Sequence, residues 1–173
     1  MGLPTPDEGL LQPVNGYYRL TRGVHAQFGL RPPDPDGAAR TALAEGADAR
    51  HFEGPGYNAC NVLDVVHPLW LSAHYSDKTR SHGEAWTRRH LAKILDRWHD
   101  GEGFAFAPDH PGEAGTPSLQ GTEMWLATIW LMADYLGMSE AVGYRPRGIH
   151  RPEPAIDRAA QSSPRGFKGA SRA

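Results

Sequence analysis

Apolar side chains recur at helical spacing in several stretches of the chain. In residues 14–28, Tyr17, Leu20, Val24 and Phe28 follow one another at intervals of three or four, which is the spacing of one helix face. The same pattern predicts helices over 14–28, 36–48, 58–75, 81–99 and 119–136, with one further turn at 139–142. The only strand-like alternation is the short GFAFAP stretch. The pattern therefore predicts an all-α protein.

The predicted helices alternate in character along the chain. The first, third and fifth are aromatic and apolar on most faces, whereas the second and fourth are polar on one side. Ser81 and Glu84 match a capping box that would open the fourth helix. Helices that are apolar all round are buried, and amphipathic ones lie at the surface. We therefore expect stacked helical hairpins, each with one inner and one outer helix.

Proline and charge divide the chain into three predicted segments. Residues 1–13 are irregular and proline-punctuated, and residues 14–143 form the helical-hairpin domain. Residues 144–173 are rich in Pro, Arg, Gly and Ser and carry seven Arg or Lys against Glu153 and Asp157. Such a segment lacks the apolar periodicity that would bury it, so we expect a flexible basic tail.

The stretch GYNACNVLDVVHPLW, residues 56–70, combines apolar and polar side chains. Asn58, Asn61 and Asp64 are three residues apart and share one helix face, which His67 continues. Pro68 cannot donate to the carbonyl of Asp64, so a kink is expected there. Buried amides and carboxyls can tie neighbouring helices together, and they can also contact a ligand. The sequence leaves both interpretations open.

The DGEGFAF loop followed by PSLQGTEMWLATIW resembles the step from loop to inner helix in α/α toroids. These are the barrels of six-hairpin glycosidases and, more distantly, of terpenoid cyclases and protein prenyltransferases. The resemblance covers residues 14–136 and implies part of a toroid, because a closed ring needs more helices than the chain predicts. The acidic run of terpenoid cyclases is absent, and one cysteine cannot supply a zinc set of the prenyltransferase type. The carbohydrate-directed branch therefore fits best.

The resemblance also implies where a ligand would bind. Inner helices of a toroid run in the same direction, so their polar N-terminal ends gather at one rim. Asp64 and Glu123 are the candidate acid and base, since glycoside hydrolysis uses two carboxyl groups. The expected substrate-binding residues are Tyr17, Tyr57, Asn58, Asn61, His67, Trp70, Gln120 and Trp125. No metal site or cofactor is expected, because no tight motif such as His-Glu-x-x-His occurs.

Three functions remain open at this point. The first is a carbohydrate-directed, glycosidase-like enzyme or a truncated remnant of one. The second is a non-enzymatic interaction module that completes its core with another chain, and the third binds a terpenoid or other apolar ligand. A deep polar cavity that reaches both acids would favour the first, an open apolar face the second, and a dry aromatic pocket the third.

Composition narrows the partners and the compartment. A net charge of −2 gives no signature of nucleic-acid or membrane binding. The single cysteine, Cys60, excludes an intramolecular disulfide and is typical of a reducing compartment. The first residues do not follow the pattern of a signal peptide. We therefore expect a cytoplasmic protein that forms a homo-oligomer or pairs with a partner chain.

Overall fold

The computed structural model describes residues 9–78 and 80–156, and within these ranges the fold is all-α. Six α-helices are present there, with no strand and only two isolated bridges, His99–Gly103 and Ala105–Pro117. The helices are α1 (Leu11–Leu20), α2 (Pro35–Gly46), α3 (Ala49–Phe52), α4 (Ala59–Ala73), α5 (Arg80–Leu95) and α6 (Leu119–Tyr135). A π-helix, η1 (Thr21–Ala26), continues α1, and the 3-10 turns are η2 (Gly54–Gly56), η3 (Glu113–Gly115), η4 (Ser139–Val142) and η5 (Gly148–His150).

The helix starts follow capping chemistry. Asp34, Asn58 and Ser118 each accept a hydrogen bond from the backbone N–H three residues later, at the starts of α2, α4 and α6. The capping box predicted at residues 81–84 does not open α5. Helix α5 already includes Arg80, so Ser81 lies in its first turn. The Glu84 carboxylate instead pairs with the Arg80 guanidinium at 3.3 Å, a contact between side chains one turn apart.

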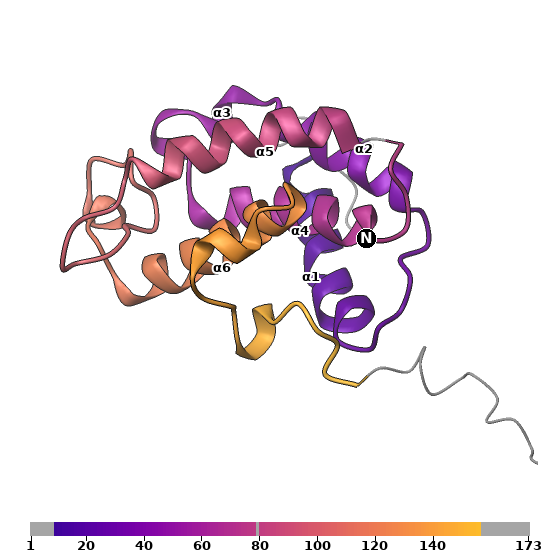
Figure 1. Cartoon of the computed structure of the whole chain (residues 1–173). Helices are drawn as coiled ribbons and strands as arrows, with labels where there is room; N and C mark the ends of the chain where they lie inside the picture. Colours follow the sequence, from indigo (N-terminus) through magenta and orange to yellow (C-terminus); the bar gives the residue numbers. More distant parts are fainter. Residues whose placement is uncertain (1–8, 79, 157–173) are drawn as a thin grey trace, which may run out of the picture.

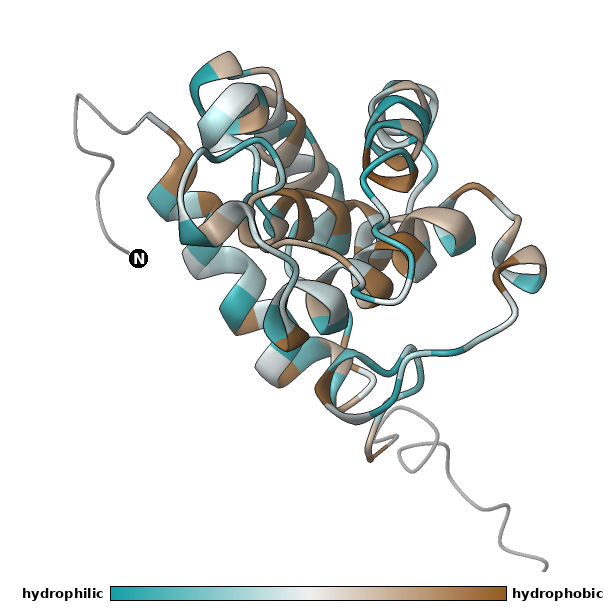
Figure 2. Cartoon of the chain, turned by 90° about the vertical axis from the view of Figure 1, so that its left-hand side faces the viewer, coloured by the Kyte–Doolittle hydropathy of each residue, from teal (hydrophilic) through white to brown (hydrophobic). Residues whose placement is uncertain are grey.

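The helices form two layers (Figure 1). Helix α5 lies with α2 and α3 on one side, and α1, α4 and α6 lie on the other. Helix α4 packs against α1, α2 and α6. Apolar residues gather where the helices face one another (Figure 2). The largest fully buried side chains include Tyr57, Leu63, Ile94, Trp125 and Leu131.

Helices α4 and α6 run in the same direction. At their N-terminal ends, Ala59 N–H donates to the Phe106 carbonyl, and Ser118 N–H donates to the Phe104 carbonyl. Near their C-terminal ends, the Trp70 indole N–H donates to Asp134 Oδ2 at 2.9 Å. One loop therefore joins both helix starts, and one side-chain bond joins both helix ends.

Helix α1 buries a different face from the one predicted. Val14, Tyr18 and Thr21 are buried, whereas Leu20 and Val24 are exposed. The prediction assumed a regular helix to residue 28, but the chain widens into the π-helix η1 at Thr21. A π-turn changes the angular positions of the side chains that follow it. The π-helix therefore explains only the side chains after Thr21. Leu20 precedes it and is exposed because the buried face of α1 is the one that carries Val14 and Tyr18.

Residues 144–156 pack on the helical body, unlike the flexible tail expected from composition. The Tyr144 hydroxyl donates to the Leu126 carbonyl at 2.7 Å. Gln27 binds this segment twice, through its side chain to the Ile149 carbonyl and through its own carbonyl to Ile156 N–H. Figure 1 shows the segment passing beneath α6 towards α1. Residues 157–173 of the predicted tail, and residues 1–8 of the predicted N-terminal segment, lie outside the described residues.

The predicted boundary after residue 13 also shifts, because α1 begins at Leu11. Of the helices in the described ranges, none combines the length and the apolarity needed to cross a membrane.

Candidate functional site

Ionisable side chains from four parts of the chain meet around Tyr18, and we call them the Tyr18 cluster: Tyr18 (α1), Asp64 and His67 (α4), Glu123 (α6) and His150 (η5). The Tyr18 hydroxyl lies 3.2 Å from His150 Nε2. His150 Nδ1 lies 3.1 Å from Glu123 Oε1. The Tyr18 and His67 rings meet edge to face at 5.2 Å. The charges of Asp64 and Glu123 both act on Tyr18, so the two predicted catalytic carboxyl groups lie in one region of the molecule.

The hydrogen-bond chain has a defined polarity. The Glu123 carboxylate only accepts, so His150 Nδ1–H donates to it. In a neutral imidazole, Nε2 is then an acceptor, and the Tyr18 O–H donates to it. Hydroxyl, imidazole and carboxylate follow one another in the order used to activate a nucleophile. Burial, however, raises the pKa of Tyr18 well above its usual range, which keeps this hydroxyl protonated.

Asp64 is the most perturbed carboxyl group of the cluster. Its side chain is 4% exposed, and its Oδ2 has no hydrogen-bond partner among the described residues. Burial raises the pKa of Asp64 to about 7, and the Arg19 and Arg22 guanidinium groups oppose that shift. Near neutral pH, protonated and ionised Asp64 are therefore both well populated. A pKa in this range suits a general acid or base.

The two histidines of the cluster are held neutral. Burial, with smaller contributions from His150 and Arg22, lowers the pKa of His67 to about 3. Its Nδ1 is buried and has no hydrogen-bond partner in the described part of the chain. Burial also lowers the pKa of His150, although the Glu123 carboxylate beside it opposes the shift. His67 is thus an apolar contact for Tyr18 rather than a proton carrier.

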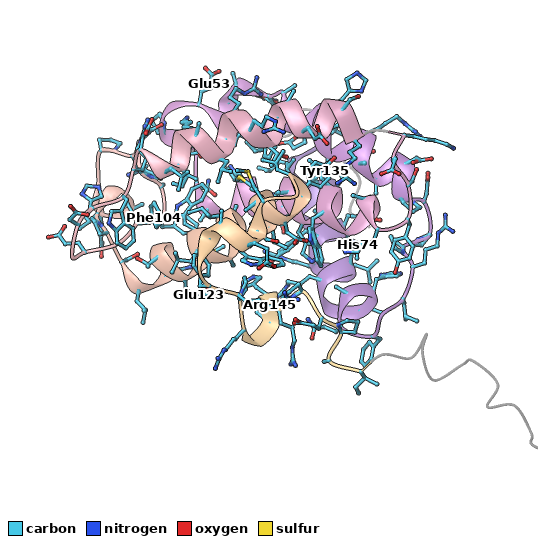
Figure 3. The ribbon with its side chains drawn as sticks, in the orientation of Figure 1. Glu53, His74, Phe104, Glu123, Tyr135 and Arg145 are labelled. Carbon is cyan, nitrogen blue, oxygen red and sulfur yellow. The ribbon has the colours of Figure 1, made fainter. Side chains whose placement is uncertain are left out.

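Access to the cluster is limited to one side. The Glu123 side chain is 57% exposed, whereas that of His150 is 8% exposed. Figure 3 shows Glu123 and Arg145 on the same side of the molecule, where the C-terminal segment crosses α6. The segment that carries His150 therefore covers Tyr18. No member of the Tyr18 cluster lines any of the three cavities described below.

The two predicted amides have structural contacts. Asn58 Oδ1 accepts from Asn61 N–H and caps α4. Asn61 Nδ2 donates to the carbonyls of His51 and Gly56, at 3.1 and 3.0 Å. These bonds fasten the α3 region to the start of α4. Of the two interpretations left open by the sequence, the observed contacts are those of the structural one.

The predicted aromatic residues are mainly core. Tyr57 is fully buried, with its ring 5.4 Å from that of Trp125. The Trp125 indole donates to the Ala105 carbonyl, and the Trp70 indole donates to Asp134. These contacts place all three aromatic side chains within the packing of α4, α6 and the loop between α5 and α6.

Tyr17 lies away from the expected common rim, whereas Gln120 lies on it, at the N-terminal end of α6. Tyr17 lines a cavity with Val14 and Pro68, beside the second half of α4 rather than its N-terminus. Gln120 is exposed in the first turn of α6. The structure therefore does not gather the predicted binding residues into one site.

Three members of the surroundings were missed at the sequence level: Tyr18, Arg22 and His150. Tyr18 follows Val14 at a helical interval. This signal was missed because the predicted apolar face was the neighbouring one that starts at Tyr17. His150 has no such signal, because it lies in an irregular segment 132 residues from its partner Tyr18. Arg22 lies 5.3 Å from the centre of the Tyr18 ring.

A second surface feature is an open apolar cavity of about 410 Å³ between α5 and α6, which we call the α5–α6 groove. One wall carries Leu91, Leu95 and Trp98, and the other carries Leu126, Ile129 and Ala133. The remaining lining residues are Phe104, Met138, Ala141, Val142 and Tyr144. No side chain in this lining is charged. Leu95 and Trp98 are 53% and 48% exposed, which is unusual for large apolar side chains.

Within the described ranges, no group of three or more His, Cys, Asp or Glu side chains is arranged to hold a metal ion. Comparison of the chain with protein-family models, curated proteins and solved structures found no match. The function is therefore argued from the chemistry of these sites.

Proposed function

We propose that the chain is a non-enzymatic interaction module whose α5–α6 groove binds an apolar helix of another polypeptide. The observation that carries this proposal is the groove itself, which is open, free of charged lining and bordered by the exposed side chains of Leu95 and Trp98. An exposed apolar surface of this kind marks a place where a partner excludes water. The Tyr18 cluster differs from the groove, because the side chains in it whose pKa values are shifted most are buried.

The spacing along the groove supports a helix as the occupant. Leu91, Leu95 and Trp98 are spaced four and three residues apart on one wall. Leu126, Ile129 and Ala133 on the other wall are spaced three and four apart. Seven residues of helix extend about 10 Å. A groove with two such walls matches a bound helix that presents apolar anchors at i, i+3 or i+4, and i+7.

The same proposal includes the larger architecture. We propose that the two helix layers are part of an α/α toroid whose remaining helices come from the partner. Support comes from the common direction of α4 and α6, which form one layer while α2, packed on α4, and α5 lie in the other. In that arrangement, the partner helix would continue the layers at the α5–α6 edge.

The experiment measures binding of a fluorescent amphipathic peptide with leucines at i, i+4 and i+7. The matched pair is Leu95→Glu/Trp98→Glu in the groove and Leu20→Glu, an exposed leucine of α1. We expect saturable binding by the natural chain and by Leu20→Glu, and a loss of about 100-fold in the groove variant, because charge in an apolar contact is costly. Equal affinity for all three proteins would contradict the proposal. Sedimentation could instead show that the natural chain is a dimer and that only the groove variant is a monomer. The occupant of the groove would then be a second copy of this chain rather than a helix of another polypeptide.

A second candidate function is the carbohydrate-directed acid–base chemistry expected from the sequence. The specific observation that favours it is the contrast between Asp64, buried with a pKa of about 7, and Glu123, half-exposed and bonded to His150. Carboxyl groups in such different environments can serve as acid and base. Residues 148–150 would have to leave Tyr18 to admit a sugar.

This candidate is tested by screening glycans for binding and hydrolysis with the natural chain, Asp64→Asn and Glu123→Gln. A true acid or base should lose about 10²-fold to 10⁴-fold in rate when its proton is removed. Failure of every glycan to bind a folded sample would eliminate this function. Hydrolysis that both variants retain would exclude the assigned residues.

A further inference from the structure

A cavity of about 480 Å³ lies on the α3 and α5 side of the molecule, remote from the Tyr18 cluster. It is bounded by the end of α2 at Gly46 and Ala47 and by α3. Helix α5 contributes Arg89, His90 and Lys93. Glu53 also lines it. Figure 3 shows Glu53 at the edge opposite Glu123. Its volume is in the range of small-molecule sites.

His90 is the unusual group in this cavity. It lines the cavity and is only 3% exposed, yet neither ring nitrogen has a hydrogen-bond partner among the described residues. Its ring is fixed by Trp86 at 4.1 Å and by Phe52 and Tyr57, each at 5.8 Å. An unpaired buried polar group is costly, and a ligand would remove that cost.

The protonation state of His90 sets what it can offer. Burial, together with the Arg89 and Lys93 charges, lowers the pKa of His90 to about 3. The ring is therefore neutral at neutral pH, with one nitrogen a donor and the other an acceptor. It can donate a hydrogen bond to a ligand oxygen without carrying a charge of its own.

Two cationic side chains, Arg89 and Lys93, line the cavity beside His90. Arg89 is exposed at the cavity. Lys93 Nζ lies 3.3 Å from Asp109 Oδ2, but Asp109 Oδ1 also accepts two hydrogen bonds from Arg97. Lys93 Nζ also donates to the Phe52 carbonyl at 3.4 Å and lies 3.7 Å from the centre of the Tyr57 ring. Turning to a ligand would weaken these contacts, but Asp109 would stay paired with Arg97. The Gly46 carbonyl is occupied by the Trp86 indole N–H. Glu53 is the opposing charge, and it is exposed to solvent.

We propose that this cavity binds a small molecule through a carboxylate or phosphate group, with Arg89 and Lys93 supplying charge and His90 donating a hydrogen bond from the cavity wall. The apolar surface of Phe52, Ala47 and Ala49 would contact the rest of the ligand. This site is independent of the α5–α6 groove and of its occupant.

The test follows the His90 ring nitrogens by NMR in the full chain during titration with sodium phosphate and with sodium acetate, at constant ionic strength, with sodium chloride as the reference. The His90 signal is identified by its absence in His90→Phe. We expect a saturable shift with phosphate, with acetate or with both, and the two arms identify which oxyanion is bound. Chloride should give none.

A matched pair of neighbouring arginines sharpens the test. Arg89→Gln should weaken binding by about tenfold, as expected for loss of a charge-assisted hydrogen bond. Arg88→Gln, which alters an exposed arginine that does not line the cavity, should leave the affinity unchanged. Absence of a saturable shift with both anions would overturn the proposal, and so would equal weakening by the two variants. Should His90→Phe fail to fold, the His90 signal is identified by its absence in His90→Gln, and the arginine pair then decides the outcome.

Discussion

The Tyr18 cluster and the α5–α6 groove differ in what they offer a ligand. The cluster holds two carboxyl groups, two imidazoles and a phenol, but Asp64, His67 and Tyr18 are buried. The groove has no ionisable side chain except the Tyr144 hydroxyl, which is already bonded to Leu126, and it is open to solvent. Perturbed pKa values occur in structural networks as well as in catalytic sites. The comparison shows that access for a ligand distinguishes a structural network from a binding site.

The cluster has a structural explanation. His150 joins Tyr18 of α1 to Glu123 of α6, so it fastens the C-terminal segment across two helices. Arg145 adds a contact at 5.3 Å to the Trp130 ring. On this account, changes in the cluster affect stability, and changes in the groove affect binding.

The largest expected effect is on the pH dependence of stability at Asp64. Its folded pKa of about 7 exceeds the ordinary aspartate pKa of 3.8, so between these pH values the folded state holds a proton that the unfolded state has released. The contribution of Asp64 to stability therefore falls as pH rises from about 4 to 7, by on the order of 4 kcal/mol. We expect the free energy of unfolding of the natural chain minus that of Asp64→Asn to fall across this window.

Denaturant titrations of both proteins at several pH values give this difference. The difference is needed because His67 and His90, whose pKa values are lowered to about 3, act in the opposite direction. Their contributions rise with pH between about 3 and 6.5, and they cancel between the two proteins. A flat difference curve would show that Asp64 is solvated or paired in solution, and would remove the contrast with Glu123.

A smaller effect is expected at the Tyr18 hydroxyl. Tyr18→Phe removes the bond to His150 and should lower the free energy of unfolding by about 1 kcal/mol, the net value of one hydrogen bond. Amide hydrogen exchange should then accelerate in residues 144–156. Tyr17→Phe is the control, because the Tyr17 hydroxyl is buried without a partner in the described structure. Destabilisation by both variants to the same extent would argue against a fastening role for His150.

The smallest effect on stability is expected in the groove. Leu95→Ala should change the free energy of unfolding by no more than about 0.5 kcal/mol, because Leu95 is more than half exposed. The same variant should reduce the fluorescence of a bound apolar dye. A loss of several kcal/mol would mean that Leu95 supports the core, and the groove would then be a packing defect rather than a binding surface.

Local patterns in the sequence predicted helices α1, α2, α4, α5 and α6, but not the short α3, and located Asp64 as an acid in an apolar helix. They did not locate the cluster, because its central bond joins Tyr18 to a histidine in a segment without periodicity. The amide pair Asn58 and Asn61 was read partly as a binding face, although an asparagine just before an apolar run is also a capping signal. The groove could not be predicted, since which apolar side chains remain uncovered depends on how α5 and α6 pack.

The most direct test of the central claim is the methyl and aromatic NMR spectra of the full chain during addition of the amphipathic peptide. The account predicts saturable shifts at Leu95, Trp98, Leu126 and Ile129, and unchanged signals for Tyr18, His67 and His150. Shifts confined to the Tyr18 cluster, or no saturable shift at the four groove residues, would contradict the assignment of the groove as the binding surface.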